Sequence, residues 1–148
     1  MADGSGMPDI GELLCFSVYS AGHAFNRAYK PLLDGLGLTY PQYLVMVALW
    51  SRDGQTVGDL GETLFLQSST LTPLLKRLEG LGHVTRERDP ADERQVRVRL
   101  TRAGTALRTK ARDIPACMLE RTGLSVRKLN RLLTDISRLR ESLLKADG

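Results

Sequence analysis

The sequence predicts a mainly α-helical fold that includes a small β-ribbon. Leucines recur at three- and four-residue steps over 71–81, which is the period of a helix with one buried face. Apolar and charged residues then alternate over 84–88 and 95–100, which is the period of paired strands. Both ends of the chain carry apolar residues in a heptad rhythm, so long helices that pack on partner helices are expected there.

Length and charge narrow the functional class. The chain has 148 residues, and 1–148 is expected to be a single domain of each subunit. Its net charge is +4, and the basic residues gather in the ribbon and the neighbouring helices, which favours nucleic acid over a membrane as the partner. The longest apolar run, Tyr43 to Trp50, is far shorter than a membrane span, and no export signal is recognisable. A cytoplasmic protein is therefore expected.

A long first helix is expected to begin at Pro8 and to close at Gly35 and Gly37. Cys15 would then lie inside this helix rather than in its first turn. The heptad seam of the helix consists of Leu14, Val18, Ala21, Phe25, Ala28 and Leu32. Because such a seam needs a partner helix, residues 8–36 are expected to serve in dimerisation.

Three further helices are expected before the ribbon. Thr39 or Tyr40, followed by Pro41, starts a second helix that is apolar on every side, and Thr56 caps a short third helix. A fourth helix begins near Ser69, has Pro73 in or near its first turn and ends at Gly80 and Gly82. Helices followed by a basic ribbon have the order of a winged helix-turn-helix, so 40–100 is expected to be a DNA-binding lobe.

The fourth helix has a polar face opposite its leucines. Small hydroxyls near its start and cations further along suit a helix that enters a major groove, where side chains reach phosphates and base edges. The residues of this helix that are expected to bind DNA are Ser68, Ser69, Thr70, Thr72, Pro73, Lys76 and Arg77. The alternative for Lys76 and Arg77 is a pair of solvated charges.

Arginines crowd the ribbon, whose strands are joined by an expected polar turn from Asp89 to Arg94. Arg86, Asp92 and Arg94 are expected to take part in DNA binding, with Arg94 at the tip, where it would enter a minor groove. The alternative is a solvated ribbon whose arginines pair with neighbouring carboxylates, namely Glu87, Asp89, Asp92 and Glu93.

The C-terminal part is expected to be helical as well. Thr101 caps a helix that Pro115 breaks ahead of Cys117, and Ser125 caps a last helix. The seam of that last helix consists of Leu129, Leu132, Ile136, Leu139 and Leu143. Residues 102–146 are therefore also expected to serve in dimerisation. A homodimer would hold two recognition helices about 34 Å apart and read a palindromic operator in double-stranded DNA.

The stretch SSTLTPLLKRLEGLGHVTRERDPADERQVRVRLTRAG resembles MarR-family transcriptional regulators, whose wing carries the DxR element that Asp92 and Arg94 match. The stretch LCFSVYSAGHAFNRAYKPLLDGLGLTYPQYLVMVALW is similar to the organic hydroperoxide resistance regulators, two-cysteine type. The resemblance implies a dimeric repressor that leaves DNA when organic hydroperoxides oxidise it. It implies that Cys15 is the redox-sensing cysteine, that Tyr29 and Tyr40 support its thiolate from the other subunit, and that Cys117 is the resolving cysteine.

The residues themselves constrain this mechanism. Tyr29 is 14 residues after Cys15, about 21 Å along a straight helix, so it can reach that sulfur only from the partner subunit. Sulfenic acid formed at Cys15 would condense with Cys117, the other cysteine of the chain, and an intersubunit disulfide would draw helices together. The alternative is that both are ordinary buried cysteines and that the tyrosines only pack.

Two other functions stay open at this point. One is a MarR-type repressor that is released by a small phenolic or hydrophobic ligand, with the cysteines incidental. The other is a thiol peroxidase, but no arginine or threonine near Cys15 would stabilise a leaving hydroxide, and an enzyme is not expected. His23 and His83 show no ligand spacing with the cysteines, so neither a metal nor another cofactor is expected.

Overall fold

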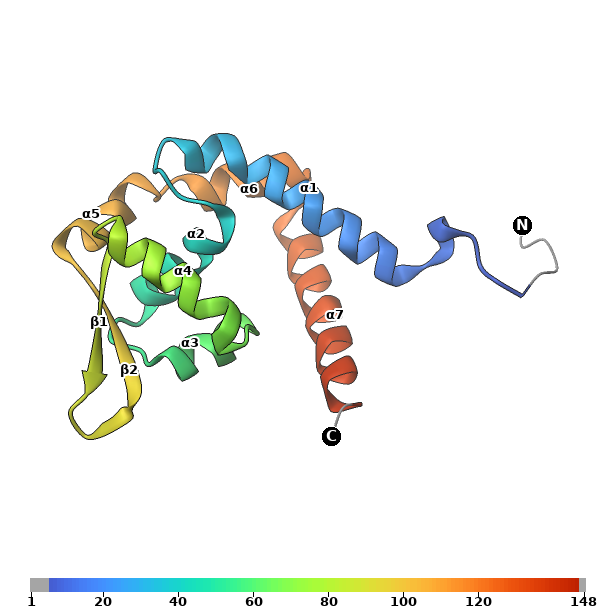
Figure 1. Cartoon of the computed structure of the whole chain (residues 1–148). Helices are drawn as coiled ribbons and strands as arrows, with labels where there is room; N and C mark the ends of the chain where they lie inside the picture. Colours follow the sequence, from blue (N-terminus) through green and yellow to red (C-terminus); the bar gives the residue numbers. More distant parts are fainter. Residues whose placement is uncertain (1–5, 147–148) are drawn as a thin grey trace. The chain divides into compact units, whose positions relative to one another are not determined.

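The computed structural model describes residues 6–146. The chain divides after Arg112 into two compact units. The first unit contains the 3-10 turn η1 (Ile10–Glu12), the helices α1 (Leu14–Asp34), α2 (Tyr40–Ser51), α3 (Val57–Leu64) and α4 (Ser68–Gly80), the strands β1 (Val84–Asp89) and β2 (Asp92–Leu100), and α5 (Arg102–Lys110) (Figure 1). The second contains α6 (Ile114–Thr122) and α7 (Val126–Lys145). The predicted fold class, mainly helical with a β-ribbon, is confirmed. Within 6–146, no helix is both long and apolar enough to cross a membrane.

The core of the first unit lies where α4 contacts α2, α3 and β1. The predicted apolar face of α4 is buried as far as Leu78, whereas Leu81 lies beyond the helix and is exposed. The fully buried side chains of this core include Met46, Leu49, Leu60, Leu71, Leu75, Leu78, Val84 and Val98. Because the leucine face of α4 is buried in this core, the opposite, polar face has to point outward.

The predicted start of the first helix is wrong. The first helix begins at Leu14 rather than at Pro8, because the η1 turn and an extended Leu13 precede it. This start places Cys15 in the first turn of α1 instead of deeper in the helix. Pro73 lies in the second turn of α4, since that helix already starts at Ser68. Its missing N–H therefore leaves the Ser69 carbonyl without its helical donor, on the exposed side of the helix.

The predicted N-caps agree with the structure. The hydroxyls of Thr39, Thr56, Thr101 and Ser125 each accept a hydrogen bond from the backbone N–H three residues later. The break that Pro115 predicts lies between α5 and α6, and this proline stands in the first turn of α6, where a missing N–H costs least.

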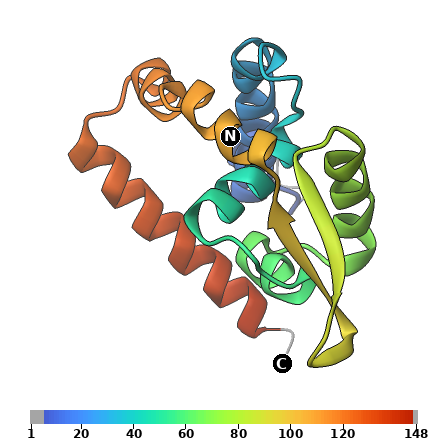
Figure 2. The ribbon, with the colours of Figure 1, turned by 90° about the vertical axis from the view of Figure 1, so that its left-hand side faces the viewer.

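The two antiparallel strands form a twisted ribbon whose tip projects past α3 and α4 (Figure 2). Only Pro90 and Ala91 separate the strands, so the turn is shorter than predicted, and Asp92 and Arg94 belong to β2. The loop before α3 runs along the outer edge of β2, where the Val98 N–H donates to the Gln55 carbonyl at 2.8 Å. The ribbon is therefore fixed to the helices along this edge.

Gly104 in α5 lies against the turn that leads into β1. A Cβ atom at this position would stand 2.0 Å from the backbone oxygen of His83, a distance that no relaxed structure tolerates. The indole N–H of Trp50 donates to the Gly104 carbonyl at 2.9 Å and ties α2 to the same place. Only glycine permits this close approach of α5.

We expect Gly104→Ala to lower the free energy of unfolding by at least about 2 kcal/mol, because the added methyl group forces two backbone segments apart. Gly80→Ala is the matched control, since its Cβ would meet nothing within 4 Å and should be neutral or stabilising by about 0.5–1 kcal/mol. Urea unfolding of both variants measures the difference. Equal stability of the two would contradict the packing described for Gly104.

Candidate nucleic-acid interface and thiol site

The outer face of α4 carries the predicted DNA-binding side chains. Lys76 and Arg77 are exposed opposite the buried leucines, and Thr72 is half-buried. The other exposed residues of this helix that were predicted to bind DNA are Ser68, Ser69, Thr70 and Pro73. The face therefore combines short hydroxyl side chains at the start of the helix with cations in its middle, a combination that fits a groove lined by phosphates.

A hollow of about 370 Å³ lies between the starts of α3 and α4 and the ribbon. Its polar lining comes from Thr56, Ser68, Thr72, Arg86, Arg94 and Gln95. Thr56 and Asp59 cap α3 reciprocally, and the hydrogen bonds from Thr56 hold the pKa of Asp59 below its usual value. The hollow thus joins the polar face of α4 to the ribbon in one surface rich in hydrogen-bond donors.

Arg86 is bound to α4 by Glu79. One carboxylate oxygen of Glu79 accepts from Arg86 Nη2 at 3.1 Å and from Nε at 3.3 Å, and the other accepts from the Arg86 backbone N–H at 3.0 Å. These hydrogen bonds lower the pKa of Glu79. The pair links β1 to α4. Sequence reasoning missed Glu79, because helical periodicity gives no sign of a partner on a later strand.

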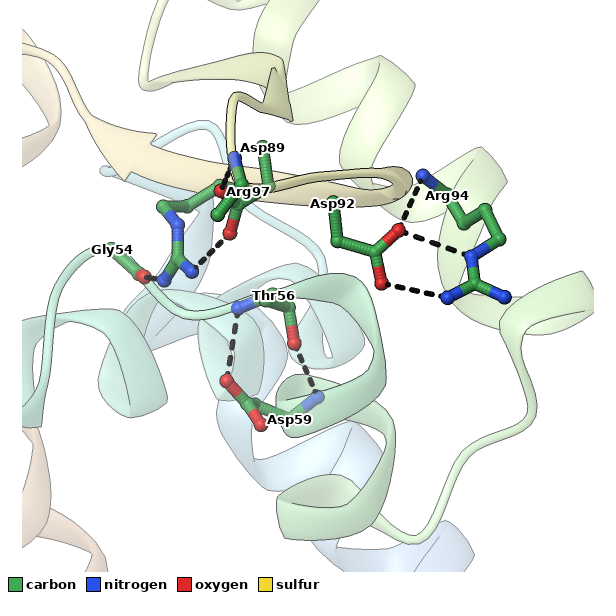
Figure 3. A network of polar contacts seen from close by, with 8 residues as sticks. Gly54, Thr56, Asp59, Asp89, Asp92, Arg94 and Arg97 are labelled. Carbon is green, nitrogen blue, oxygen red and sulfur yellow. Dashed lines mark hydrogen bonds and ion pairs between the residues drawn. The ribbon is translucent and has the colours of Figure 1, made fainter.

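Arg97 makes a second link, on β2. Its guanidinium lies between the Asp89 carboxylate and the Gly54 carbonyl and donates to both (Figure 3). Asp89 also accepts from the Ala91 N–H at 2.9 Å, and these bonds, led by that from Arg97, lower its pKa. The predicted alternative of arginine–carboxylate pairing therefore applies to part of the ribbon.

Arg94 lies near the start of β2, close to the turn, and 91% of its side chain is exposed. The Asp92 carboxylate accepts from the backbone N–H and from Nε of Arg94, both at 3.1 Å (Figure 3). Asp92 thus orients the guanidinium while leaving most of its surface open. Of the ribbon residues predicted to bind DNA, Arg94 is the one that is most accessible, whereas Arg86 is largely engaged by Glu79.

Both thiols are exposed on the chain, so neither belongs to its core. Cys15 lies in the first turn of α1, and Cys117 lies in α6 of the second unit. Tyr29 and Cys15 lie on the same continuous helix, which excludes contact between them within one chain, as predicted. In the part of the chain that the structure covers, no three His, Cys, Asp or Glu side chains are grouped to hold a metal ion.

The two predicted thiolate-supporting tyrosines lie together in one chain. The rings of Tyr29 and Tyr40 stack with their centroids 4.6 Å apart, and the ring centroid of Tyr43 lies 5.5 Å from that of Tyr29. Burial, with further contributions from Tyr40 and Tyr43, raises the pKa of Tyr29 to about 12. Its hydroxyl therefore remains protonated at neutral pH and is available as a hydrogen-bond donor.

The comparisons with known proteins agree with this geometry. A family model described as the transcriptional regulator SarA/Rot matches residues 27–111, more than half of the chain. The organic hydroperoxide resistance transcriptional regulator of Bacillus subtilis is 45% identical over 130 residues, which cover 88% of each protein. The chain belongs to the MarR family of transcriptional regulators. Another relative, the regulator TtmR of Methylorubrum extorquens, is 49% identical over 88% of this MarR-family chain and 67% of its own length.

Solved structures of AbfR of Staphylococcus epidermidis are similar in fold to this chain. Reduced AbfR bound to DNA has a TM-score of 0.78 at 34% identity, over 91% of this chain and 94% of AbfR. Disulfide-formed AbfR has a TM-score of 0.65 at 36% identity, over 88% and 91%. This MarR-family protein is accordingly a DNA-binding transcriptional regulator, and its relatives are regulators rather than enzymes.

We expect Arg94→Ala to weaken operator binding by about 5- to 150-fold, because a well-placed arginine contact in a groove contributes about 1–3 kcal/mol. The probe is a duplex that the wild-type protein selects from a randomised library, called the selected operator below, and affinity is measured by fluorescence anisotropy. Lys110→Ala removes the same charge from α5 and should bind normally. Wild-type affinity of Arg94→Ala would refute the role of the ribbon tip.

Proposed function

We propose that the protein is a homodimeric repressor that releases its operator when an organic hydroperoxide oxidises Cys15. Residues 40–100 would form the DNA-binding lobe, and 8–36 and 102–146 would form the dimerisation helices. The observation that carries the proposal is the exposed Cys15 thiol in the first turn of α1, in a chain whose B. subtilis relative is named for organic hydroperoxide resistance.

The proposed dimer is supported by the apolar side chains that the chain leaves uncovered. On the α1 seam, Leu14, Val18 and Phe25 are exposed, and α7 has no buried residue although it is strongly amphipathic. Leu132, Ile136 and Leu143 of the α7 seam are exposed as well. Exposed heptad seams of this length are stable in water when they pack against a partner helix. A two-fold dimer would then read a palindromic operator.

The proposed switch begins with the Cys15 thiolate. It attacks a peroxide oxygen, so that an S–O bond forms and the O–O bond breaks, and the leaving alkoxide takes up a proton and departs as an alcohol. Because Cys15 is exposed on the chain, a hydroperoxide can reach its sulfur. Tyr29 and Tyr40 of the partner subunit would donate hydrogen bonds to this sulfur without adding a charge.

The sulfenic acid would then react with Cys117 of the partner subunit. The Cys117 thiolate attacks the oxidised sulfur, a disulfide forms, and hydroxide leaves and is protonated to water. The disulfide-formed state of AbfR supports this step by analogy. Because a disulfide needs Cα atoms within about 7 Å, closing it would displace helices and change the spacing of the two DNA-binding lobes.

We expect wild-type protein to release the selected operator after one equivalent of organic hydroperoxide and to rebind it after dithiothreitol, because the thiolate is the reacting group. Cys15→Ser should stay bound throughout. Release of both proteins, or of neither, would contradict the thiol switch and would favour regulation by a small phenolic or hydrophobic ligand. Consumption of many equivalents of hydroperoxide would instead indicate an enzyme.

We expect Cys117→Ser still to form a sulfenic acid at Cys15, which dimedone labels, but not to form a disulfide-linked dimer on a non-reducing gel. Ala116→Ser, a neighbouring exposed position in α6, is the matched control and should form the linked dimer as the wild type does. A linked dimer in oxidised Cys117→Ser would remove Cys117 from the mechanism.

A further inference from the structure

The ribbon is attached to the helices along both of its strands. On the β1 side, Glu79 of α4 binds the backbone and the side chain of Arg86. On the β2 side, the loop before α3 pairs with the strand, since the Leu100 N–H donates to the Asp53 carboxylate and the Val98 N–H to the Gln55 carbonyl, both at 2.8 Å. A two-stranded ribbon is marginally stable by itself, so these attachments determine its direction.

Arg97 and Asp89 extend this attachment to the tip. Arg97 Nη1 donates to the Gly54 carbonyl in the loop before α3, and Nη2 donates to Oδ2 of Asp89. The other Asp89 oxygen accepts from the Ala91 N–H, which lies in the turn itself. Both carboxylate oxygens of Asp89 are thus occupied, and only 11% of its side chain is exposed. The Arg97 side chain, together with Asp89, therefore connects the turn that precedes Arg94 to the loop before α3 (Figure 3).

We propose that Asp89 and Arg97 are positioning residues for operator binding, which hold the ribbon tip against the Gly54 carbonyl and thereby present Arg94 at a fixed distance from α4. The proposal rests on the proposed DNA contact of Arg94. Asp89 is not expected to touch DNA, because a buried carboxylate offers no donor to a phosphate and repels it. Holding the tip in advance reduces the ordering that binding would otherwise require.

Asp89→Asn distinguishes the positioning role from a general electrostatic effect, because the two predict opposite changes in the affinity for DNA. Removing a negative charge from a DNA-binding surface should strengthen binding, whereas loss of the link should weaken binding of the selected operator, by about tenfold if the tip must be ordered on binding. Glu87→Gln is the matched control. Glu87 lies opposite Arg97 in the ribbon, is exposed and, among residues 6–146, makes no side-chain hydrogen bond or ion pair. The Glu87→Gln variant should bind the selected operator as tightly as the wild type or more tightly.

A second variant guards against a folding defect. Arg97→Lys keeps the charge but replaces the planar guanidinium, whose two terminal nitrogens donate separately to Gly54 and Asp89, by a single ammonium nitrogen. It should therefore also weaken binding of the selected operator, with unchanged circular dichroism and sedimentation. In an Arg94→Ala background, Asp89→Asn should add less than about a twofold loss, because the contact it positions is already gone. Wild-type or tighter binding by Asp89→Asn or Arg97→Lys, or full additivity with Arg94→Ala, would overturn the positioning role.

The same measurements distinguish a failure of this proposal from a failure of the proposed function. Normal binding by Arg94→Ala alone would remove the contact on which the link acts and would overturn both the contact and the positioning role. Normal binding by Asp89→Asn, with weak binding by Arg94→Ala, would overturn the positioning role alone. Release by hydroperoxide is measured separately and depends on neither result.

Discussion

The burial of the leucine face of α4 is the constraint on which the proposed DNA-binding surface depends. Leu71, Leu75 and Leu78 are fully buried, and α4 contacts α2, α3 and β1. A helix that buries this face has no rotational freedom left, so Lys76 and Arg77 are fixed on the outside. The hydrophobic effect, which is non-directional, thereby sets the direction of the polar groups.

The ribbon is positioned by a different kind of interaction. Its apolar contribution to the core is small, with Val84 and Val98 fully buried, and its direction is set by charge-assisted hydrogen bonds to Glu79 and to the loop before α3. Such bonds are directional and stronger than neutral ones, particularly where water is partly excluded. Three of the ribbon arginines therefore differ in what their side chains do. Arg86 and Arg97 hold the ribbon in place, and Arg94 remains exposed at its tip.

The proposed sensor is built differently from the DNA-binding surface, because one chain does not complete it. Tyr29 and Tyr40 are stacked and protonated, yet the Cys15 of their own chain is far along α1. The exposed apolar seams of α1 and α7 would be covered by a second copy of the chain in the proposed dimer. A thiol site shared between subunits would couple its oxidation directly to the arrangement of the two DNA-binding lobes, since any movement at the interface is transmitted by whole helices.

The sequence by itself determined the features that depend on neighbours along the chain. Leucine spacing predicted the buried face of α4, alternation predicted the ribbon, and the hydroxyls of Thr39, Thr56, Thr101 and Ser125 predicted where helices begin. It misplaced the start of α1 and the length of the ribbon turn, because both depend on competition between nearby hydrogen-bond patterns. Only the tertiary structure decided the pairing of Glu79 with Arg86 and of Arg97 with Gly54. Those residues lie on different elements, and periodicity carries no information about which side chains meet after the elements have packed.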